Sequence, residues 1–258
     1  MAMKDCMYDT VPISVVMPAY NAEKTIAESI ETVLKQTHEN IELIIVDDAS
    51  IDATASIINT YARKNPQIRI LRNTKNMGVA ETRNKGIEAA KSDWIALLDS
   101  DDLWEPDKLE RQIALAYQEQ AEIVYCSYDF IDEQGTSIKK PFIVPRTTNF
   151  KQMLSKSVIS CSTALIAARI LKENLFDASF YHEDYALWMR LLSIPVLAVG
   201  DTKVLMHYRQ VAGSRNGNKR KAAIERWKVY RGYLGMSFFQ SLCAFIAYAF
   251  NGAVKYIG

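Results

Sequence analysis

The sequence offers little material for a metal cluster or a disulfide framework. Its four cysteines are scattered without a Cys-x-x-Cys pair, and it contains only three histidines. Zinc sites and disulfide frameworks need such residues at close, regular spacings, so the sequence argues against both. Scattered cysteines also fit a reducing, cytoplasmic compartment. Residues 1–10 contain no apolar run, so no secretory signal is expected.

The chain also lacks a strong overall charge, but its charges are unevenly distributed. The formal net charge is +1 over 258 residues. From Lys203 onward the chain holds ten of its 31 Lys and Arg residues and only one of its 30 acidic residues, Glu225. A basic, partly apolar end on an acidic body predicts an anionic partner at that end. The length predicts one medium domain, or one domain with an appendage.

Strand-like and helix-like segments alternate through the first 120 residues. We expect buried strands at 11–17, 41–46, 68–71 and 94–98, with Pro18 ending the first of them. We expect helices at 22–36, 52–65, 78–91 and 107–120. This alternation is typical of βαβ units built on a parallel sheet.

The second half of the chain is less regular. Strands are expected at 123–130, 196–199 and 203–208, and a helix at 185–192. Residues 136–163 show no clear period and are expected to form an irregular, variable region. Residues 213–218 are expected to form a flexible, basic loop.

Polar residues follow each of the first four strands. They are Pro18-Ala19-Tyr20, Asp47-Asp48, Arg72-Asn73 and Asp99-Ser100-Asp101-Asp102. In open α/β sheets ligands bind beyond the carboxyl ends of the strands, so these clusters should meet at one edge. Close carboxylates repel, and they persist where a cation or a proton relieves the repulsion. Hard oxygen ligands of this kind predict magnesium or manganese on a nucleotide diphosphate.

Five motifs in this order resemble family 2 glycosyltransferases, which are inverting enzymes of the GT-A fold. The motifs are Val15-Val16-Met17-Pro18-Ala19-Tyr20-Asn21, Val46-Asp47-Asp48-Ala49-Ser50-Ile51-Asp52, Asn76-Met77-Gly78-Val79-Ala80 with Arg83-Asn84, Asp99-Ser100-Asp101-Asp102, and Glu183-Asp184-Tyr185-Ala186-Leu187-Trp188. They cover roughly residues 13 to 192, which makes a chance match improbable. The resemblance implies an α/β chain with a GT-A-type mixed sheet, whose N-terminal half is a Rossmann-like nucleotide-binding unit. The fold alone does not name the sugar.

The resemblance implies a donor site made of seven residues: Pro18, Ala19, Tyr20, Asp48, Arg83, Asp99 and Ser100. The backbone of the first three lines the nucleoside pocket. Asp48 accepts a hydrogen bond from the base, which favours uracil or another base with an imide or amide donor. Arg83 approaches the nucleotide or its phosphates, and Asp99 lies toward the ribose.

The resemblance also implies a divalent cation, manganese or magnesium, near Asp99 and Asp101, with His207 as a further candidate ligand. Such a cation stabilises the negative charge that builds up on the leaving diphosphate. Asp184, with Glu183 beside it, is implied as the catalytic base. Inversion in one step needs a base on the opposite face of the sugar to take the proton of the attacking hydroxyl.

Several of these residues have a plain structural alternative. Asp47 is expected to be a turn residue, Asp52 a helix N-cap and Asp102 a cap of its own turn. Glu183 and Asp184 also suit the positive N-terminal end of a helix dipole. For His207, core packing competes with metal binding. Arg209, Ser214 and Arg215 either close over the diphosphate or belong to a mobile, solvated loop.

An uncharged run from Gly232 to Val254 follows the basic stretch at the C-terminal end. Its apolar residues recur at helical spacing on one side, which predicts an amphipathic helix better than a transmembrane span. That side is Phe238, Phe239, Leu242, Phe245, Ile246, Ala249 and Phe250; the opposite side is Gln240, Ala244, Tyr248 and Asn251. We expect this helix to contact the anionic inner face of the cell membrane. Docking on the catalytic domain or on a second copy is the alternative.

The sequence thus predicts a glycosyltransferase domain at 1–212 and a basic, amphipathic helical tail at 213–258. The expected partners are a nucleotide-sugar donor, a glycan or lipid-linked glycan acceptor of surface polysaccharide or lipopolysaccharide, and an anionic membrane. No nucleic acid is expected. A catalytically degenerate binding protein of the same fold is one alternative. A sugar nucleotidyltransferase is disfavoured, because residues 18–23 contain no glycine for a phosphate loop.

Overall fold

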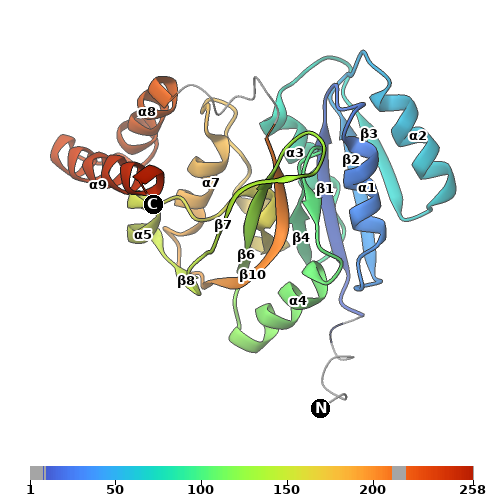
Figure 1. The fold of residues 1–258 in the computed structure, drawn as a ribbon, viewed down its shortest axis with the longest axis horizontal. Coiled ribbons are helices and arrows are strands. Elements are labelled where there is room, and N and C mark those ends of the chain that lie inside the picture. Colours follow the sequence, from blue (N-terminus) through green and yellow to red (C-terminus); the bar gives the residue numbers. More distant parts are fainter. Residues whose placement is uncertain (1–7, 9, 211–218, 258) are drawn as a thin grey trace.

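Ten strands form one mixed sheet with helices on both faces in the computed structural model, which describes residues 8, 10–210 and 219–257 (Figure 1). Their order is β3-β2-β1-β4-β9-β6-β10-β5, with β7 paired to β6 and β8 paired to β10. The strands are β1 (Ile13–Ala19), β2 (Ile41–Asp47), β3 (Ile68–Arg72), β4 (Trp94–Leu97), β5 (Leu103–Trp104), β6 (Ile123–Ile131), β7 (Ser137–Phe142), β8 (Thr147–Thr148), β9 (Leu165–Ala167) and β10 (Ala198–Arg209). The first four pair in parallel, whereas β9 is antiparallel to β4 and β6. The predicted α/β mixed sheet is confirmed.

Side chains alternate between the two faces of the sheet, so each face has its own apolar core. Val15 and Met17 of β1 join one core with α1, α2 and α4, while Val16 joins the other with α3, α5, α6 and α7. The helices are α1 (Ile26–Leu34), α2 (Thr54–Lys64), α3 (Val79–Ala89), α4 (Lys108–Glu119), α5 (Phe150–Ser155), α6 (Ala168–Glu173), α7 (Glu183–Leu191), α8 (Lys219–Lys228) and α9 (Phe238–Ile257). On the face where Val16 lies, α5, α6 and α7 come from the C-terminal half of the chain, and α7 carries the predicted catalytic base, Asp184.

Helix α3 lies close against the sheet at Gly86. A Cβ at this position would come within 2.5 Å of Val16 Cγ1 and 3.2 Å of Val46 Cγ2. Helix α3 begins after Gly78, whose φ of 84° lies in the region that favours glycine. These two glycines let α3 approach β1 and β2 closely, and Arg83 lies between them in sequence.

Strand β1 runs through Pro18 to Ala19, although the sequence predicted that Pro18 would end it. Pro18 is paired with Val46 of β2, while pairing with β4 stops at Val16 and Leu97. Leu98 N donates to Val16 O on the β4 side, and the missing N–H of Pro18 faces that same side beyond the end of the ladder. The proline therefore costs the sheet no ladder bond.

Two further expectations for the second half were wrong. The region 136–163, expected to be irregular, contains β7, β8, α5 and a 3₁₀ turn at Cys161–Thr163. The two strands expected at 196–199 and 203–208 are one long strand, β10, which contains irregular register shifts between Asp201 and Met206. Short or bulged elements of this kind give too little period for a sequence pattern to detect.

The C-terminal tail folds as α8, a π-helical turn at Val229–Tyr233 and α9, and it packs beside α5 and α7 (Figure 1). In α9 the side facing the protein is the smaller and more polar one, because Ser241 and Ala244 are buried there. Phe239 is 77% exposed and Ile246 is 59% exposed. The predicted amphipathic helix is therefore present, but the predicted apolar side is largely turned outward. Among the helices in the described ranges, none has the length and apolar character needed to cross a bilayer.

Candidate active site

The loop that carries Asp99 to Asp102 follows β4 and is held from three distant elements. Asp99 N donates to Ser162 Oγ at 3.0 Å, in the 3₁₀ turn. Thr25 Oγ1, just before α1, donates to Ser100 O at 2.9 Å. At the end of β10, the backbone N of Arg209 donates to Asp102 Oδ1 at 3.1 Å. The carboxylates are therefore placed by fixed backbone contacts and not by a solvated turn.

Burial and mutual repulsion disfavour the ionised forms of two of these carboxyl groups. The pKa of Asp101 is raised to about 6, first by burial and then by the charge of Asp99. Asp102 is 1% exposed, and burial followed by the charges of Asp101 and Asp99 raises its pKa well above the usual range. A cation placed beside Asp101 would relieve this repulsion. The loop thus has the electrostatics of a cation site.

The oxygen ligands available suit magnesium or manganese only if a ligand supplies further oxygens. Among the residues the structure describes, no three Asp, Glu, His or Cys side chains are arranged to hold an ion by themselves. Magnesium bound next to phosphates usually takes one or two carboxylates from the protein and the rest from phosphate and water. Asp101 and the second oxygen of Asp99 fit that pattern, because only Asp99 Oδ1 is engaged by Arg83.

Arg83 joins the strand-end carboxylates to the start of α7. Its Nη2 lies 2.6 Å from Asp99 Oδ1 and its Nη1 lies 2.9 Å from Glu183 Oε1. The residue is 3% exposed, and the ring of Phe176 lies 5.2 Å from its Cζ. Buried charges need close partners, and Arg83 has one on each side. Two motifs that lie about a hundred residues apart in sequence therefore meet at this side chain.

Glu183 and Asp184 have different surroundings despite being adjacent. Glu183 is buried and paired with Arg83. Asp184 is half-buried, and its Oδ1 accepts the backbone N–H of Tyr185 at 2.7 Å. The negative charges of both Asp102 and Asp184 help to raise the pKa of Tyr128, after burial. Asp102 and Asp184 therefore both lie close enough to Tyr128 to affect its pKa.

The loops after β1 and β2 are bonded to each other on the nucleotide side of the predicted site. Asn21 N donates to Ser50 Oγ at 3.1 Å, and Ile51 N donates to Asn21 Oδ1 at 3.0 Å. Asn21 and Ala49 have φ values of 48° and 59°, which non-glycine residues seldom adopt. Strained backbone of this kind concentrates at ligand sites. Tyr20, beside these loops, is 48% exposed.

Asp48 is buried and most of its acceptor capacity is used by its own chain. Its Oδ1 accepts from Asn73 Nδ2 at 2.7 Å and from Met77 N at 2.8 Å, and its Oδ2 accepts from Gly78 N at 2.9 Å. A carboxylate has about four acceptor positions, so about one is left for a ligand. Asp48 thus shapes the loop that enters α3. Neighbouring Asp47 accepts from Ser50 N and pairs with Arg72, as expected of a turn residue.

His207 lies on β10 between two carboxylates. Its Nδ1 is 2.7 Å from Asp129 Oδ1 and its Nε2 is 3.1 Å from Glu105 Oε1. Both ring nitrogens are therefore engaged, and His207 would have to release one carboxylate to bind a metal. Its assignment as a metal ligand stays a prediction.

Arg209 lies at the end of β10, beside the loop that carries Asp101. Its guanidinium is buried, donates from Nε to Asp101 O at 3.0 Å and from Nη1 to Glu133 O at 2.9 Å, and pairs with Glu28. These contacts contradict the alternative that Arg209 belongs to a mobile, solvated loop, and its closing role over the diphosphate stays a prediction. Ser214 and Arg215, predicted to close with it, lie outside the described residues.

The sequence did not indicate the residues that support the carboxylate loop. Ser162 is fully buried, and its carbonyl accepts from Trp104 Nε1 at 2.7 Å while its hydroxyl accepts from Asp99 N. Cys161, beside it, is buried near Arg83, Asp184 and Asp99, and burial raises its thiol pKa. The only available signal was the polar run Ser160 to Thr163 within an otherwise apolar stretch.

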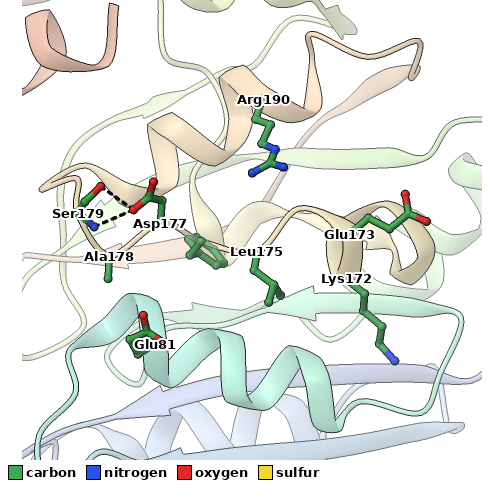
Figure 2. Close-up of a pocket in the computed structure, with 9 residues that line it drawn as sticks. Glu81, Lys172, Glu173, Leu175, Asp177, Ala178, Ser179 and Arg190 are labelled. Carbon is green, nitrogen blue, oxygen red and sulfur yellow. Dashed lines mark hydrogen bonds between the residues drawn. The ribbon is translucent and has the colours of Figure 1, made fainter. Parts of the chain in front are cut away.

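A cavity of about 610 Å³ lies on a different part of the second face, between α3, α6 and α7. Figure 2 shows Glu81 on its α3 side and Arg190 pointing into it from α7. It is open and lined largely by charged side chains, and Phe176, whose ring lies 5.2 Å from Arg83 Cζ, also lines it. We do not assign the site to this cavity, because the converging carboxylates are not among its lining residues.

Residues 14–175 match the family model described as glycosyl transferase family 2. The chain belongs to this family. It is therefore a glycosyltransferase. Across 243 residues it is 33% identical to TuaG of Bacillus subtilis, a glycosyltransferase assigned to teichuronic acid biosynthesis, covering 94% of this chain and 96% of TuaG. It is 35% identical over 244 residues to WfaP of Escherichia coli, a UDP-Glc:alpha-D-GlcNAc-diphosphoundecaprenol beta-1,3-glucosyltransferase, covering 95% of each chain.

Solved structures of low sequence identity share the fold. S. aureus TarS, solved with UDP-GlcNAc, superposes with a TM-score of 0.71 and 19% identity over 86% of this chain and 65% of that chain. The mannosyltransferase PcManGT of Pyrobaculum calidifontis, solved with GDP-Man and Mn²⁺, has a TM-score of 0.68 and 17% identity over 89% and 66%. These neighbours confirm the predicted GT-A fold of this glycosyltransferase.

Proposed function

We propose that this glycosyltransferase inverts the anomeric carbon as it transfers a single sugar from a UDP-sugar to a glycan or lipid-linked glycan of a cell-surface polysaccharide. The observation that carries the proposal is the double ion pair of Arg83, which joins Asp99 of the Asp99–Asp102 loop to Glu183, the neighbour of Asp184 in sequence. The functions of TuaG and WfaP, and the UDP-GlcNAc bound to TarS, support the donor and acceptor classes.

On this proposal the donor lies at the carboxyl edge of β1, β2 and β4. The backbone of Pro18, Ala19 and Tyr20 flanks the nucleoside, and Asp48 offers its remaining acceptor position to the base. Arg83, Asp99 and Ser100 lie toward the ribose and diphosphate. Arg83 pairs with both Asp99 and Glu183, so its positive charge already offsets part of the negative charge next to the diphosphate before the donor arrives.

A divalent cation held by Asp101 and Asp99 would neutralise charge on the leaving diphosphate. The half-buried carboxylate of Asp184 accepts the proton of the acceptor hydroxyl as that oxygen attacks the anomeric carbon. Glu183 binds Arg83 and thereby fixes the first turn of α7, which orients Asp184. We assign Glu183 this supporting part, with the base chemistry falling to its neighbour.

We further propose that the protein works at the cytoplasmic face of the membrane through its tail, residues 213–258. Phe239, Leu242 and Ile246 are exposed at helical spacing on α9 and form one outward stripe. The preceding segment 219–231 is rich in Lys and Arg, which favours anionic lipid. A lipid-linked acceptor would be reached from that position.

The donor class is tested by thermal shift with UDP, GDP, CDP and ADP, each with and without manganese. A nucleotide at about a hundred times its dissociation constant should stabilise the fold by roughly 2.7 kcal/mol. We expect a manganese-dependent shift with UDP that is weakened in Asp101→Asn. A shift with another nucleotide would change the donor, and no shift with any nucleotide would contradict the proposal.

A further inference from the structure

The segment that carries Glu183 and Asp184 is contacted by the tail on both sides of these carboxylates. On the N-terminal side, the ring of Phe180 packs edge-on against Tyr233 of the π-helical turn, with centroids 5.0 Å apart. On the C-terminal side, Tyr185 packs edge-on against Tyr230 of the same turn, at 6.4 Å. The position of the two carboxylates is therefore bracketed by tail residues.

Arg226 of α8 adds a third contact and joins three helices at one side chain. Its Cζ lies 3.8 Å from the ring centroid of Tyr185 in α7 and 3.8 Å from that of Tyr248 in α9. Arg226 is 5% exposed, and its Nη1 is buried without a hydrogen-bond partner. A buried guanidinium is costly unless something replaces its hydration, and two aromatic faces do so here. This arrangement needs both rings in place.

Tyr185, and Tyr230 that packs against it, are both fixed to α5 by their hydroxyl groups. Tyr185 Oη donates to Met153 O at 3.3 Å, and Tyr230 Oη donates to Leu154 O at 2.7 Å, both in α5. Burial raises the pKa of both tyrosine hydroxyls, so they remain neutral donors at physiological pH. A shift of Arg226 would thus be transmitted to Tyr185, which is adjacent to Asp184 in sequence.

We propose that Arg226 is a positioning residue for sugar transfer. Its guanidinium, held between Tyr248 of α9 and Tyr185 of α7, fixes the first turn of α7 and with it the direction of the Asp184 carboxylate. The tail is then part of the catalytic unit as well as a membrane contact. This inference rests on the proposed role of Asp184 as base.

The test compares Arg226→Met and Arg226→Lys with wild type, using Arg169→Met as the control. Arg169 is an exposed arginine of α6 that pairs with Glu122, and its replacement makes the same chemical change without touching α7, α8 or α9. The first readout is hydrogen exchange of the peptide 180–191. We expect faster exchange there in Arg226→Met, partial recovery in Arg226→Lys, which keeps the charge, and wild-type exchange in the control.

The second readout is steady-state transfer with a water-soluble acceptor and no lipid. We expect kcat to fall at least about tenfold in Arg226→Met while KM for the UDP-sugar stays the same, because a misdirected base slows chemistry and leaves donor binding intact. Unchanged exchange, or a loss confined to donor KM, would overturn the inference.

Tyr248 supplies a second pair of variants should Arg226→Met fail to fold. Tyr248→Phe keeps a ring face over Arg226 and should behave as wild type, whereas Tyr248→Leu removes it and should reproduce both effects in weaker form. Equal behaviour of the two Tyr248 variants would overturn the inference. If wild type transfers no sugar, the proposed function fails, while the exchange comparison still decides whether Arg226 positions α7.

Discussion

The two halves of the site are built in different ways. The donor half lies on loops between residues 18 and 102, and the loops after β1 and β2 are bonded directly to each other. The acceptor half depends on contacts between segments that are far apart, such as Arg83 with Glu183 and Tyr185 with Arg226. The loops after β1 and β2 in the donor half are therefore pre-organised by each other, and only its Asp99–Asp102 loop needs the distant Ser162 and Arg209. The acceptor half, in contrast, is completed by the C-terminal part of the protein.

The largest effect should come from removing the catalytic base, Asp184, because this change should impair the acceptor half and leave the donor half intact. We expect Asp184→Asn to lower kcat by roughly 10²- to 10⁴-fold, the usual contribution of general base catalysis. Donor affinity, measured by calorimetry with UDP and manganese, should be unchanged, because Asp184 is absent from the donor half. Near-normal turnover of the variant would refute its assignment as base.

Breaking the link between the halves should destabilise the whole fold. Arg83→Met leaves buried Glu183 and partly exposed Asp99 without their partner, which typically costs about 3–5 kcal/mol for a buried pair. Urea unfolding measures this loss. The double variant Arg83→Met with Glu183→Gln should recover part of it, because the buried glutamate charge is then also removed. A double variant no more stable than the single one would contradict this account.

The stability of the fold should depend on pH through Asp101, which belongs to the donor half. The pKa of Asp101 is raised in the folded protein to about 6, so the folded state holds this proton more tightly than the unfolded chain. Without metal, the stability contributed by this group is complete below about pH 4 and is lost as the pH rises through about 6. As the pH rises from 5 to 7, the stability of Asp101→Asn should therefore increase relative to that of wild type. The expected increase is ~1.4 kcal/mol or more, the free energy that corresponds to one pKa unit.

Melting curves at several pH values without divalent cations measure this difference. Adding manganese and UDP at pH 7 should reverse the order, since only the wild type then has both carboxylates, Asp99 and Asp101, for the cation. Parallel pH profiles of the two proteins would show that Asp101 is not the titrating group.

The smallest effect on the domain should come from the outward stripe of α9. Phe239→Ser combined with Ile246→Ser changes exposed side chains, so unfolding should shift by only about 0.5 kcal/mol for each. Binding to vesicles containing anionic lipid, measured by flotation, should fall clearly. Ile51→Ser, at an 88% exposed position far along the chain, is the control. Unchanged flotation of the double variant would contradict the proposed membrane contact.

The same contrast explains what the sequence could and could not predict. Strands β1 to β4 and the loops after them follow local patterns, so the sheet edge and the Asp99–Asp102 cluster were foreseeable. The supporting role of Ser162, the carboxylate contacts of His207 and the buried position of Arg209 arise from pairings across 60 or more residues. The periodicity of apolar residues along the sequence carries no information on contacts between such distant residues. For α9 the pattern indicated an amphipathic helix, but not that Ser241 and Ala244 would be the docked side.

The sheet order has a consequence for synthesis of the chain on the ribosome. Strand β4 is completed at Leu97, but its neighbour β9 begins at Leu165, about 70 residues later. At translation rates of about 5–20 residues per second, the apolar edge of β4 waits several seconds for its partner. An unpaired strand edge readily pairs with other chains. Slow translation between these strands would therefore favour aggregation. Chaperones that bind at the ribosome and cover apolar segments should raise the yield of folded protein.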